Sequence, residues 1–459
     1  MMSRKANDFG KDPVPVLVLK ISIPFMFAQF VNVLYSIVDR IYIGNIPVVG
    51  DVSLAGAGVC APIITLLSSF ATLIGIGGSV LFSMRLGAGD REKAKNILAN
   101  SFSLLLLFSA VLTLVFLLIK GQLLRWFGAS DITWPYANTY LTIYTLGTFF
   151  ALLSMGMNYF ITAQGFPLLG MVTTLVGAVV NTALDPVFIF LFHMNIAGAA
   201  LATVIAQLCS CAFVLLVLRQ KKMPVPLTLA RPEKKLSFRI VKMGFSPFLI
   251  LATDSVVIIA LNAVLQYFGG PEYGDTLITC ATIVQSYMLL ITSPMLGITG
   301  GSQPLISFNY GANRADRIRK IVFCVLTLCI CFTAFMFLVS RIMPQYFVRI
   351  FTDTPEYMEL SVWGIRVFTL AIIPLSFQYV FVDALTALSM TRLSLFLSLF
   401  RKGTYFLATC LLPMFLAAKM AFYAEPLADG IAFFSSSTAF FFVYRKYLKG
   451  EGRLTHINF

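Results

Sequence analysis

The sequence predicts an all-α polytopic membrane protein, with about twelve transmembrane helices in two pseudo-symmetric six-helix bundles. Its composition is the first reason: 58% of the 459 residues are hydrophobic, 12% are charged, and the mean hydropathy is +0.87. Soluble domains carry about 25% charged residues, so a soluble fold of this length would lack the charge to cover its surface. The alternation of polar and apolar residues that is typical of outer-membrane barrels does not occur. The composition therefore excludes a cytosolic enzyme, a disordered chain and a secreted disulfide scaffold.

Twelve apolar runs are the second reason, because each has the roughly 20 residues that cross a bilayer. Six are expected in the first half, at 15–38, 56–83, 95–119, 135–160, 168–191 and 197–218. Six more are expected in the second half, at 239–265, 278–300, 319–343, 362–389, 393–417 and 427–447.

The charges indicate topology rather than a nucleic-acid partner. Lys and Arg number 34 against 20 Asp and Glu, a net charge of +14. With 392–402 counted among the loops, 27 of the 34 basic residues lie near one side of the expected membrane, as the positive-inside rule describes. We therefore expect a multi-pass protein of the cell (inner or plasma) membrane with both termini in the cytoplasm.

An internal repeat is the third reason for the predicted fold. Four landmarks recur at offsets of 220 to 227 residues: Pro24 with Pro247, Gly87 with Gly311, Pro135 with Pro355, and Pro186 with Pro413. Six spans in each half give both halves the same orientation, related by an axis along the membrane normal. We expect an N-terminal bundle at 13–218, a basic cytoplasmic linker at 219–238, a C-terminal bundle at 239–447 and a cytoplasmic tail at 448–459. Duplicated bundles of this kind favour a transporter over a receptor.

Polar residues within the spans of the first half form a candidate cation site. A carboxylate at the centre of a span raises the free energy of membrane insertion by about 2.5–3.5 kcal/mol, so its presence suggests a functional role. Asn181 and Asp185 are four residues apart and share one helix face, and Asp39 lies in the first span. Their oxygens suit Na⁺, and two carboxylates brought together also favour retention of a proton. Further candidates for the same interior are Asn32, Tyr140 and Thr203.

Two other interpretations of these residues stay open. The first is a hydrogen-bonded cluster between helices with no ion, and the second is an ion pair between Asp39 and its neighbour Arg40. In the second half, Asp254 and Asp383 are candidate substrate or proton sites, or carboxylates paired with polar neighbours. Asp429, at the edge of the twelfth span, is interpreted as an interfacial residue at a helix start.

Helix bending and the hydrophobic wall complete the candidates. Prolines inside helices remove a backbone donor and bend them, and the candidate hinges are Pro24, Pro186, Pro247 and Pro413. The 43 Phe, 18 Met and 17 Tyr suit lipophilic cations through cation–π contacts and adaptable packing, although most of these residues must face lipid.

Several short motifs, in order along the chain, resemble the multidrug and toxic compound extrusion (MATE) family, in particular its prokaryotic multidrug efflux branch. The resemblance covers about 13–448. The matching stretches are Val38 to Gly44, Leu86-Gly-Ala-Gly89, Gln164-Gly-Phe-Pro167, Asn181-Thr-Ala-Leu-Asp-Pro186, Ala197 to Thr203, Gly301 to Ile306, Asn309-Tyr-Gly-Ala312 and Ala424 to Asp429.

The resemblance implies two bundles around a cavity and export of organic cations in exchange for Na⁺ or H⁺. It implies a coupling site at Asp39, Tyr140, Asn181, Asp185 and Thr203, with Na⁺ as the one metal ion, held by Asp39, Asn181, Asp185 and Thr203. Asn32 stands where a Gln is often found, and an Arg directly after the first-span Asp is unusual for the family. Asp254 and Asp383 resemble acidic positions of another branch, which places its cation site in the C-terminal bundle, so the resemblance leaves the bundle open.

We therefore expect an antiporter that functions as a monomer. Its expected partners are organic cations and the lipid bilayer. We expect no catalytic residues, no cofactor and no nucleic-acid partner. One alternative is a flippase for lipid-linked precursors, which would line its cavity with Arg and Lys for pyrophosphate. A membrane-embedded enzyme is an alternative of another class, and it would need a nucleophile with a base or a metal beside it. The sequence does not choose between Na⁺ and H⁺.

Overall fold

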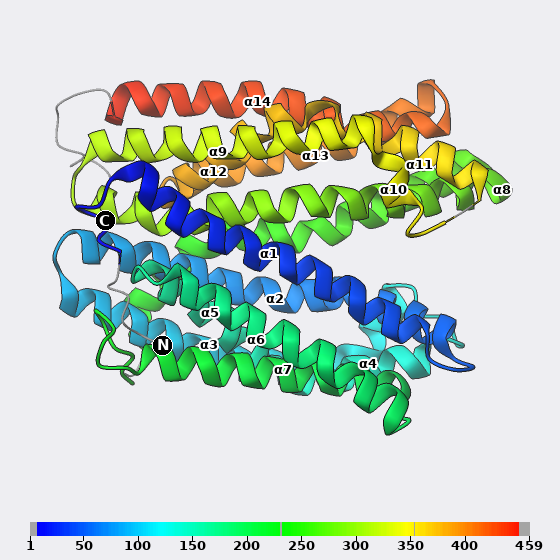
Figure 1. Ribbon diagram of the computed structural model, residues 1–459, viewed down its shortest axis with the longest axis horizontal. Helices are drawn as coiled ribbons and strands as arrows, with labels where there is room; N and C mark the ends of the chain where they lie inside the picture. The colour runs from blue at the N-terminus through cyan, green and yellow to red at the C-terminus, as the bar shows by residue number, and fades with distance from the viewer. Residues whose placement is uncertain (1–6, 230–231, 353, 449–459) are drawn as a thin grey trace. The chain divides into compact units, whose positions relative to one another are not determined.

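The computed structural model describes residues 7–229, 232–352 and 354–448, which form helices and connecting turns with no β-strand among them (Figure 1). Of the expected tail at 448–459, residues 449–459 lie outside the described residues, as do 230–231 of the expected linker. The helices of the first half are α1 (Val14–Gly44), α2 (Gly50–Gly87), α3 (Arg91–Trp126), α4 (Trp134–Leu146), α5 (Thr148–Ala163), α6 (Pro167–Pro186), the π-turn η1 (Val187–Leu191) and α7 (Asn195–Leu218).

The helices of the second half begin with α8 (Lys234–Gly311), which contains two candidate spans, Lys234–Gly270 and Thr276–Gly311. Between them Gly270 has a φ of 72°, a left-handed value that glycine adopts without strain. The remaining elements are α9 (Ala315–Ile342), α10 (Pro344–Val348), α11 (Pro355–Phe368), η2 (Thr369–Ala371), α12 (Ile372–Ala387), α13 (Thr391–Phe415), η3 (Ala418–Tyr423), α14 (Ala424–Val443) and η4 (Tyr444–Leu448).

The predicted number of spans is confirmed. Eleven helices in the described ranges are long and apolar enough to cross a membrane, and the count is twelve when α4 and α5 form one bent span. These two helices meet at 55°, on either side of Gly147. A Cβ at Gly147 would collide with the side chain of Val204 in α7, so glycine lets α7 approach the bend. The span expected at 135–160 is therefore a bent helix pair.

The chain divides into two compact units. The first residues of α1 and of α8 belong to a different unit from the rest of the same helix. The first unit comprises Met1–Asp12 and Phe27–Ala252, and the second comprises Pro13–Met26 and Thr253–Phe459. The beginning of α1 is thus part of the second unit, and the beginning of α8 is part of the first. These memberships differ from the ranges expected from sequence, 13–218 and 239–447, because the first helix of each half contributes to both units.

Close glycine contacts explain why these helix starts pack as they do. In the first unit, a Cβ at Gly244 would collide with the carbonyl oxygen of Leu73 in α2. In the second unit, a Cβ at Gly297 would lie 2.6 Å from the Cα of Met26. Gly297 is 224 residues beyond Leu73, so the same position of the repeat makes a close backbone contact in each unit. The partners are not equivalent, because Gly244 corresponds to Lys20 in the repeat and the contact of Gly297 is with Met26.

The turns before α3 and α9 also correspond, but their capping residues differ. Gly89 (φ 82°) and Asn313 (φ 58°) both have left-handed backbone conformations at the same repeat position. Asp90 then caps α3 by accepting a hydrogen bond from the backbone N–H of Lys93 at 3.1 Å. The side-chain and backbone hydrogen bonds from Lys93 hold the pKa of the Asp90 carboxyl below its usual value. At the corresponding position before α9, Arg314 makes no side-chain capping hydrogen bond.

Candidate cation site

The centre of the candidate site is a hydrogen-bonded group of three residues in the first unit. Asn181 and Asp185 lie one turn apart near the end of α6, and both are buried. The Nδ2 of Asn181 donates to Asp185 Oδ1 at 3.2 Å and to Thr203 Oγ1, on α7, at 3.3 Å. The hydroxyl of Thr203 donates in turn to the carbonyl of Ala199 at 3.0 Å. The amide of Asn181 and the hydroxyl of Thr203 therefore both have acceptors for their protons.

Asp39 joins this group from α1. Its carboxyl lies within hydrogen-bonding reach of the Asp185 carboxyl. Two ionised carboxylates have no donor to offer each other, so a shared proton or a bridging cation would stabilise such a pair. Buried oxygens without a hydrogen-bond partner occur on both carboxyls and on the neighbouring amide: Asp39 Oδ1, Asp185 Oδ2 and Asn181 Oδ1. Such orphaned acceptors are rare in protein interiors, and carboxylate and amide oxygens are the ligands that hard cations prefer.

Tyrosines surround the two carboxylates. Tyr140 is buried, is hydrogen-bonded to Thr203 and interacts electrostatically with Asp39. Its ring stacks on Tyr144 with centroids 6.4 Å apart and an interplanar angle of 13°. Tyr35, one turn before Asp39 on α1, interacts with both Asp39 and Tyr144. The site therefore combines aromatic side chains with carboxylates, a composition that suits an organic cation.

Sequence reasoning missed four members of this site: Tyr35, Ser68, Tyr144 and Gln207. Tyr144 is hydrogen-bonded to Gln207 and Ser68. Helix spacing could have found three of the four, because each lies four residues from a candidate on the same helix: Tyr35 from Asp39, Tyr144 from Tyr140, and Gln207 from Thr203. Ser68 carries no such signal.

Two predictions from the sequence do not fit the geometry around Asp39. Asn32 is half-buried and donates to Gln29 Oε1 at 3.0 Å on its own helix, so its amide is directed to α1 rather than to the Asp39–Asp185 pair. Arg40 is exposed. Within residues 7–229, 232–352 and 354–448, neither Asp39 nor Asp185 lies within ion-pair distance of a basic side chain, although Arg40 attracts the Asp39 carboxyl electrostatically.

The acidic candidates of the second unit have partners of their own. Asp254 Oδ1 forms a 2.7 Å ion pair with Lys402 Nζ, which also donates to Thr253 Oγ1 at 2.8 Å. The Asp254 side chain is 49% exposed. Asp383 on α12 is hydrogen-bonded to Thr299 and Gln303 on α8. The two acids therefore belong to separate polar contacts, one of them with a built-in cation.

A buried ion network in α13 and α14 corrects the interpretation of Asp429. Arg401 donates from Nε to Asp429 and from Nη2 to Glu425, each at 2.7 Å. The side chains of Arg401, Glu425 and Asp429 are 17%, 16% and 0% exposed. Asp429 is therefore a buried ion-pair partner and not an interfacial helix-start residue.

The same network removes two basic residues from the expected cytoplasmic side. Arg401 and Lys402 lie in the middle of α13, although the topology argument counted them among loop charges. Carboxylates on neighbouring helices compensate them, which is how basic side chains are tolerated inside a span. Without them, the sequence still assigns 25 of the 34 basic residues to the expected cytoplasmic side.

The hinge candidates lie inside helices. Pro24 and Pro413 interrupt the ladders of α1 and α13, and Pro186 ends α6 where the π-turn η1 begins. Pro24 lies two residues before the point where α1 passes from the second unit to the first. Pro247 lies five residues before the corresponding point in α8.

Two repeated helical units, membrane-spanning helices and a buried carboxylate pair define an integral membrane transporter rather than an enzyme. The chain belongs to the MatE family, whose model matches residues 24–187 and 251–405. Similar curated proteins include the multidrug export protein MepA of Staphylococcus aureus (strain MSSA476), 26% identical over 391 residues that cover 84% of each chain.

Solved structures show the same fold. The MATE multidrug transporter DinF-BH, solved in complex with a ligand, is 28% identical, with a TM-score of 0.87 over 97% of this chain and 99% of that one. A MOP superfamily transporter from Pyrococcus furiosus is 20% identical, with a TM-score of 0.89 over 97% of this chain and 100% of that one. The predicted fold class and family are confirmed.

Proposed function

We propose that this protein exports organic, lipophilic cations in exchange for Na⁺ or H⁺ by alternating access. The observation that carries the proposal is the interaction between the carboxyls of half-buried Asp39 and buried Asp185, which a proton or a cation between them would stabilise. The names of the relatives, a multidrug export protein and a multidrug transporter, support the substrate class. The protein acts in the cell membrane as a monomer, with both termini in the cytoplasm.

The coupling follows from charge. With neither a proton nor Na⁺ bound, the Asp39–Asp185 pair attracts an organic cation, and the rings of Tyr140 and Tyr35 contact its planar face. Binding of Na⁺ or H⁺ neutralises the pair and removes this attraction. The two ligands are therefore negatively coupled, and by linkage each weakens the other's binding by the same factor. Asn181 and Thr203 direct the Asp185 carboxylate and supply oxygen ligands for Na⁺.

The first unit is the better location for coupling because it brings two carboxyls together outside ion-pair distance of any basic side chain in the described residues. Asp383 of the second unit, by contrast, interacts with Thr299 and Gln303. In the second unit Lys402 already supplies a cation to Asp254, and Arg401 supplies one to Glu425 and Asp429. A dissolved cation would have to displace these tethered groups. Asp39 and Asp185 pose no such competition, since neither is ion-paired in the described part of the chain.

We assign the movement between the two access states to α1 and α8, the crossing helices, each of which contributes residues to both units. Pro24 and Pro247 lie close to where α1 and α8 pass between the units, and each proline lacks a backbone N–H that would stiffen its helix. Bending of α1 at Pro24 would move Asp39 relative to Asp185, which is held on α6. Pro186 and Pro413 provide the same weakness near the ends of α6 and α13.

The buried Arg401 and Lys402 are the one observation that favours the flippase alternative. A pyrophosphate group would require uncompensated positive charge. Here Arg401 and Lys402 face three carboxylates, those of Asp254, Glu425 and Asp429, so the group carries a formal charge of −1. Organic cations therefore fit this chain better than lipid-linked pyrophosphates.

The proposal is tested with purified protein in liposomes loaded with a fluorescent lipophilic cation. A Na⁺ gradient and a pH gradient are imposed separately, and dye movement is followed. We expect one gradient to drive movement that Asp39→Asn and Asp185→Asn abolish, whereas Asp131→Asn, which removes an exposed acid, leaves it unchanged. Transport that persists in both variants contradicts the coupling site. Movement of a lipid-linked pyrophosphate, with no cation moved by either gradient, contradicts the substrate class.

A further inference from the structure

The buried ion network between α13 and α14 contains more acid than base. Arg401 on α13 donates from Nε to Asp429 and from Nη2 to Glu425, each at 2.7 Å. Both acids lie on α14, four residues apart, so they share one face of that helix. One guanidinium therefore meets two carboxylates. These three side chains, the α13–α14 triad, carry a formal charge of −1 when both acids are ionised.

This charge would lie inside membrane-spanning helices. The candidate spans are Thr391–Phe415 and Ala418–Leu448. Asp429 is fully buried, and the side chains of Arg401 and Glu425 are 17% and 16% exposed. An uncompensated charge within a span is costly. A buried acid avoids this cost by retaining its proton, which leaves it neutral.

Within the described residues, the groups that interact with the triad do not supply the missing positive charge. Asp254 on α8 interacts electrostatically with Glu425, but it forms a 2.7 Å ion pair with Lys402, so these two added charges cancel. Tyr379 on α12 and Tyr405 on α13 also interact with the triad, and phenols carry no charge at neutral pH. The triad therefore keeps its excess of one negative charge.

One oxygen of the triad is left without a hydrogen bond. Asp429 Oδ1 accepts from Arg401, whereas Asp429 Oδ2 is buried and has no hydrogen-bond partner among the described residues. Buried acceptors of this kind are rare in proteins. Asp429 also interacts electrostatically with Glu425 one turn earlier, and like charges at this spacing repel. A single proton on either carboxyl would remove the repulsion and the uncompensated charge together.

We infer that the α13–α14 triad is a proton-binding site, in which Glu425 and Asp429 together hold one exchangeable proton at neutral pH. The other carboxyl then pairs with Arg401, and the group is neutral. A proton adds to a lone pair and leaves Arg401 in place, whereas Na⁺ or an organic cation would have to displace it. The second unit therefore titrates independently of the first. This inference goes beyond the proposed exchange, and it holds whichever ion binds at Asp39 and Asp185.

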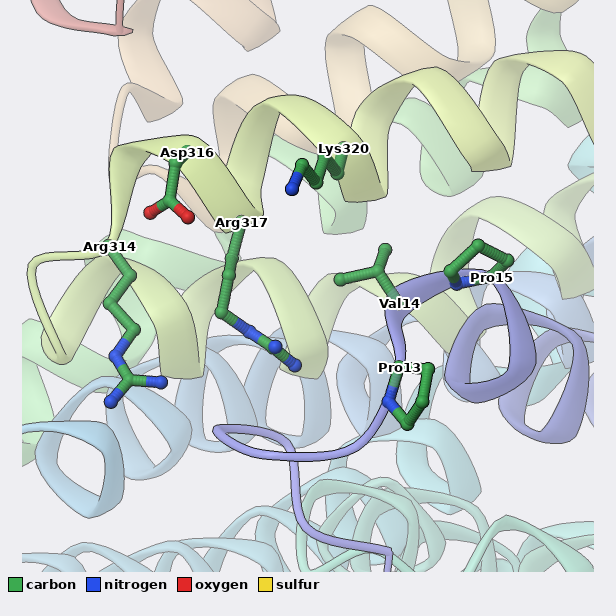
Figure 2. A pocket seen from close by; sticks show the side chains of 7 residues that line it. All are labelled: Pro13, Val14, Pro15, Arg314, Asp316, Arg317 and Lys320. Carbon is green, nitrogen blue, oxygen red and sulfur yellow. The ribbon is translucent and has the colours of Figure 1, made fainter.

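The control acid comes from a part of the second unit with the opposite balance of charge. A cavity of about 630 Å³ lies at the beginning of α1 and α9 (Figure 2). Its lining includes one carboxylate, Asp316, and three basic side chains, those of Arg314, Arg317 and Lys320. Asp316 is exposed, so Asp316→Asn removes a carboxylate of the same unit without changing the buried triad.

The first experiment is infrared spectroscopy of the purified full-length protein in detergent as the pH is raised. A protonated carboxyl has a C=O stretch that a carboxylate lacks and that shifts in D₂O. Asp39→Asn with Asp185→Asn serves as the background, so that these acids of the first unit do not contribute. We expect Glu425→Gln and Asp429→Asn each to remove one protonated carboxyl per molecule, because the remaining carboxylate pairs with the guanidinium without a proton. Asp316→Asn should remove none.

Thermal unfolding over the same pH range gives an independent readout. A proton held in the folded state stabilises that state at low pH, and this stability is lost as the pH rises through the release of the proton. The Tm of the unmodified protein and of Asp316→Asn should therefore fall in this range. The Tm of Glu425→Gln should lack this fall, because its triad is neutral without a proton.

Two results would overturn the inference. One is an infrared band that neither Glu425→Gln nor Asp429→Asn changes. The other is a Tm of Glu425→Gln that is lower by the same amount at every pH, which would indicate an ion network without a proton. If Asp429→Asn does not fold, Glu425→Gln carries both measurements.

Discussion

The carboxyls of Asp39 on α1 and Asp185 on α6 interact inside the first unit, although the two residues are 146 positions apart in sequence. Burial prevents water from screening them, so their combined charge depends on what they bind. A single proton or metal ion changes the electrostatics of the whole tyrosine-lined site. The contact thus gives the protein a direct physical link between ion binding and the affinity for an organic cation.

Neutralising Asp185 should imitate the ion-loaded state. In Asp185→Asn, equilibrium binding of a lipophilic dye should weaken about tenfold or more, since one charge-assisted contact is worth about 1.5–3 kcal/mol. The remaining affinity should no longer respond to Na⁺ or pH, because the competing ligand has lost its site. Fluorescence titration in detergent measures both. Unchanged affinity with unchanged Na⁺ and pH dependence would contradict the coupling mechanism.

Removing the hydroxyl of Thr203 should affect the coupling ion more than the organic cation. Thr203→Val preserves the side-chain shape but leaves the Nδ2 of Asn181 without its 3.3 Å partner. One neutral hydrogen bond contributes about 0.5–1.5 kcal/mol, so the ion concentration for half-maximal competition should rise severalfold. Thr173→Val is the matched control, because this buried threonine donates to the carbonyl of Leu169 on its own helix. An equal effect of both substitutions would indicate general destabilisation.

Breaking the Arg401 network should destabilise the second unit strongly. Arg401→Met leaves Glu425 and Asp429 buried without their cation, and removal of one partner from a buried ion pair costs about 3–5 kcal/mol. We expect a clear fall in Tm, measured by thermal unfolding in detergent. Adding Glu425→Gln and Asp429→Asn to the variant should restore much of the loss. Arg392→Met, at an exposed position of the same helix, should have little effect; a similar fall there would argue against the network.

The glycine contacts of the crossing helices should tolerate no side chain. Gly244→Ala places a methyl group against the backbone of Leu73, and Gly297→Ala places one against Met26. Both require backbone movement, so each should lower the free energy of unfolding by about 1–3 kcal/mol, as for overpacked cores. The loss should be visible as a lower Tm and a lower yield of folded protein. Gly58→Ala has open space around its Cβ and should be neutral or slightly stabilising. Wild-type stability of Gly244→Ala would disprove the close packing.

The features that could be predicted from the sequence are those set by a residue's own helix. The spans, the repeat and the pairing of Asn181 with Asp185 followed from apolar runs and from a spacing of four residues. Contacts between helices were harder: Arg401 lies in a predicted span, but its compensation by Glu425 and Asp429 depends on how α14 packs on α13. At the α4–α5 bend the Val204 side chain approaches Gly147, and the starts of α1 and α8 pack where backbone approaches glycine. Neither kind of contact leaves a hydrophobic pattern in the sequence.

The crossing of the two helices also has a consequence for biosynthesis. The ribosome synthesises α2 before Gly244. The contact between Leu73 and Gly244 therefore cannot form until translation has reached the second half of the chain. The first residues of α1 wait longer still, until Gly297 has been made. Neither half can therefore mature when it is first inserted, and a chain truncated after the linker would expose backbone-lined grooves to quality-control proteases. Completion of folding is postponed until translation is well into the second half.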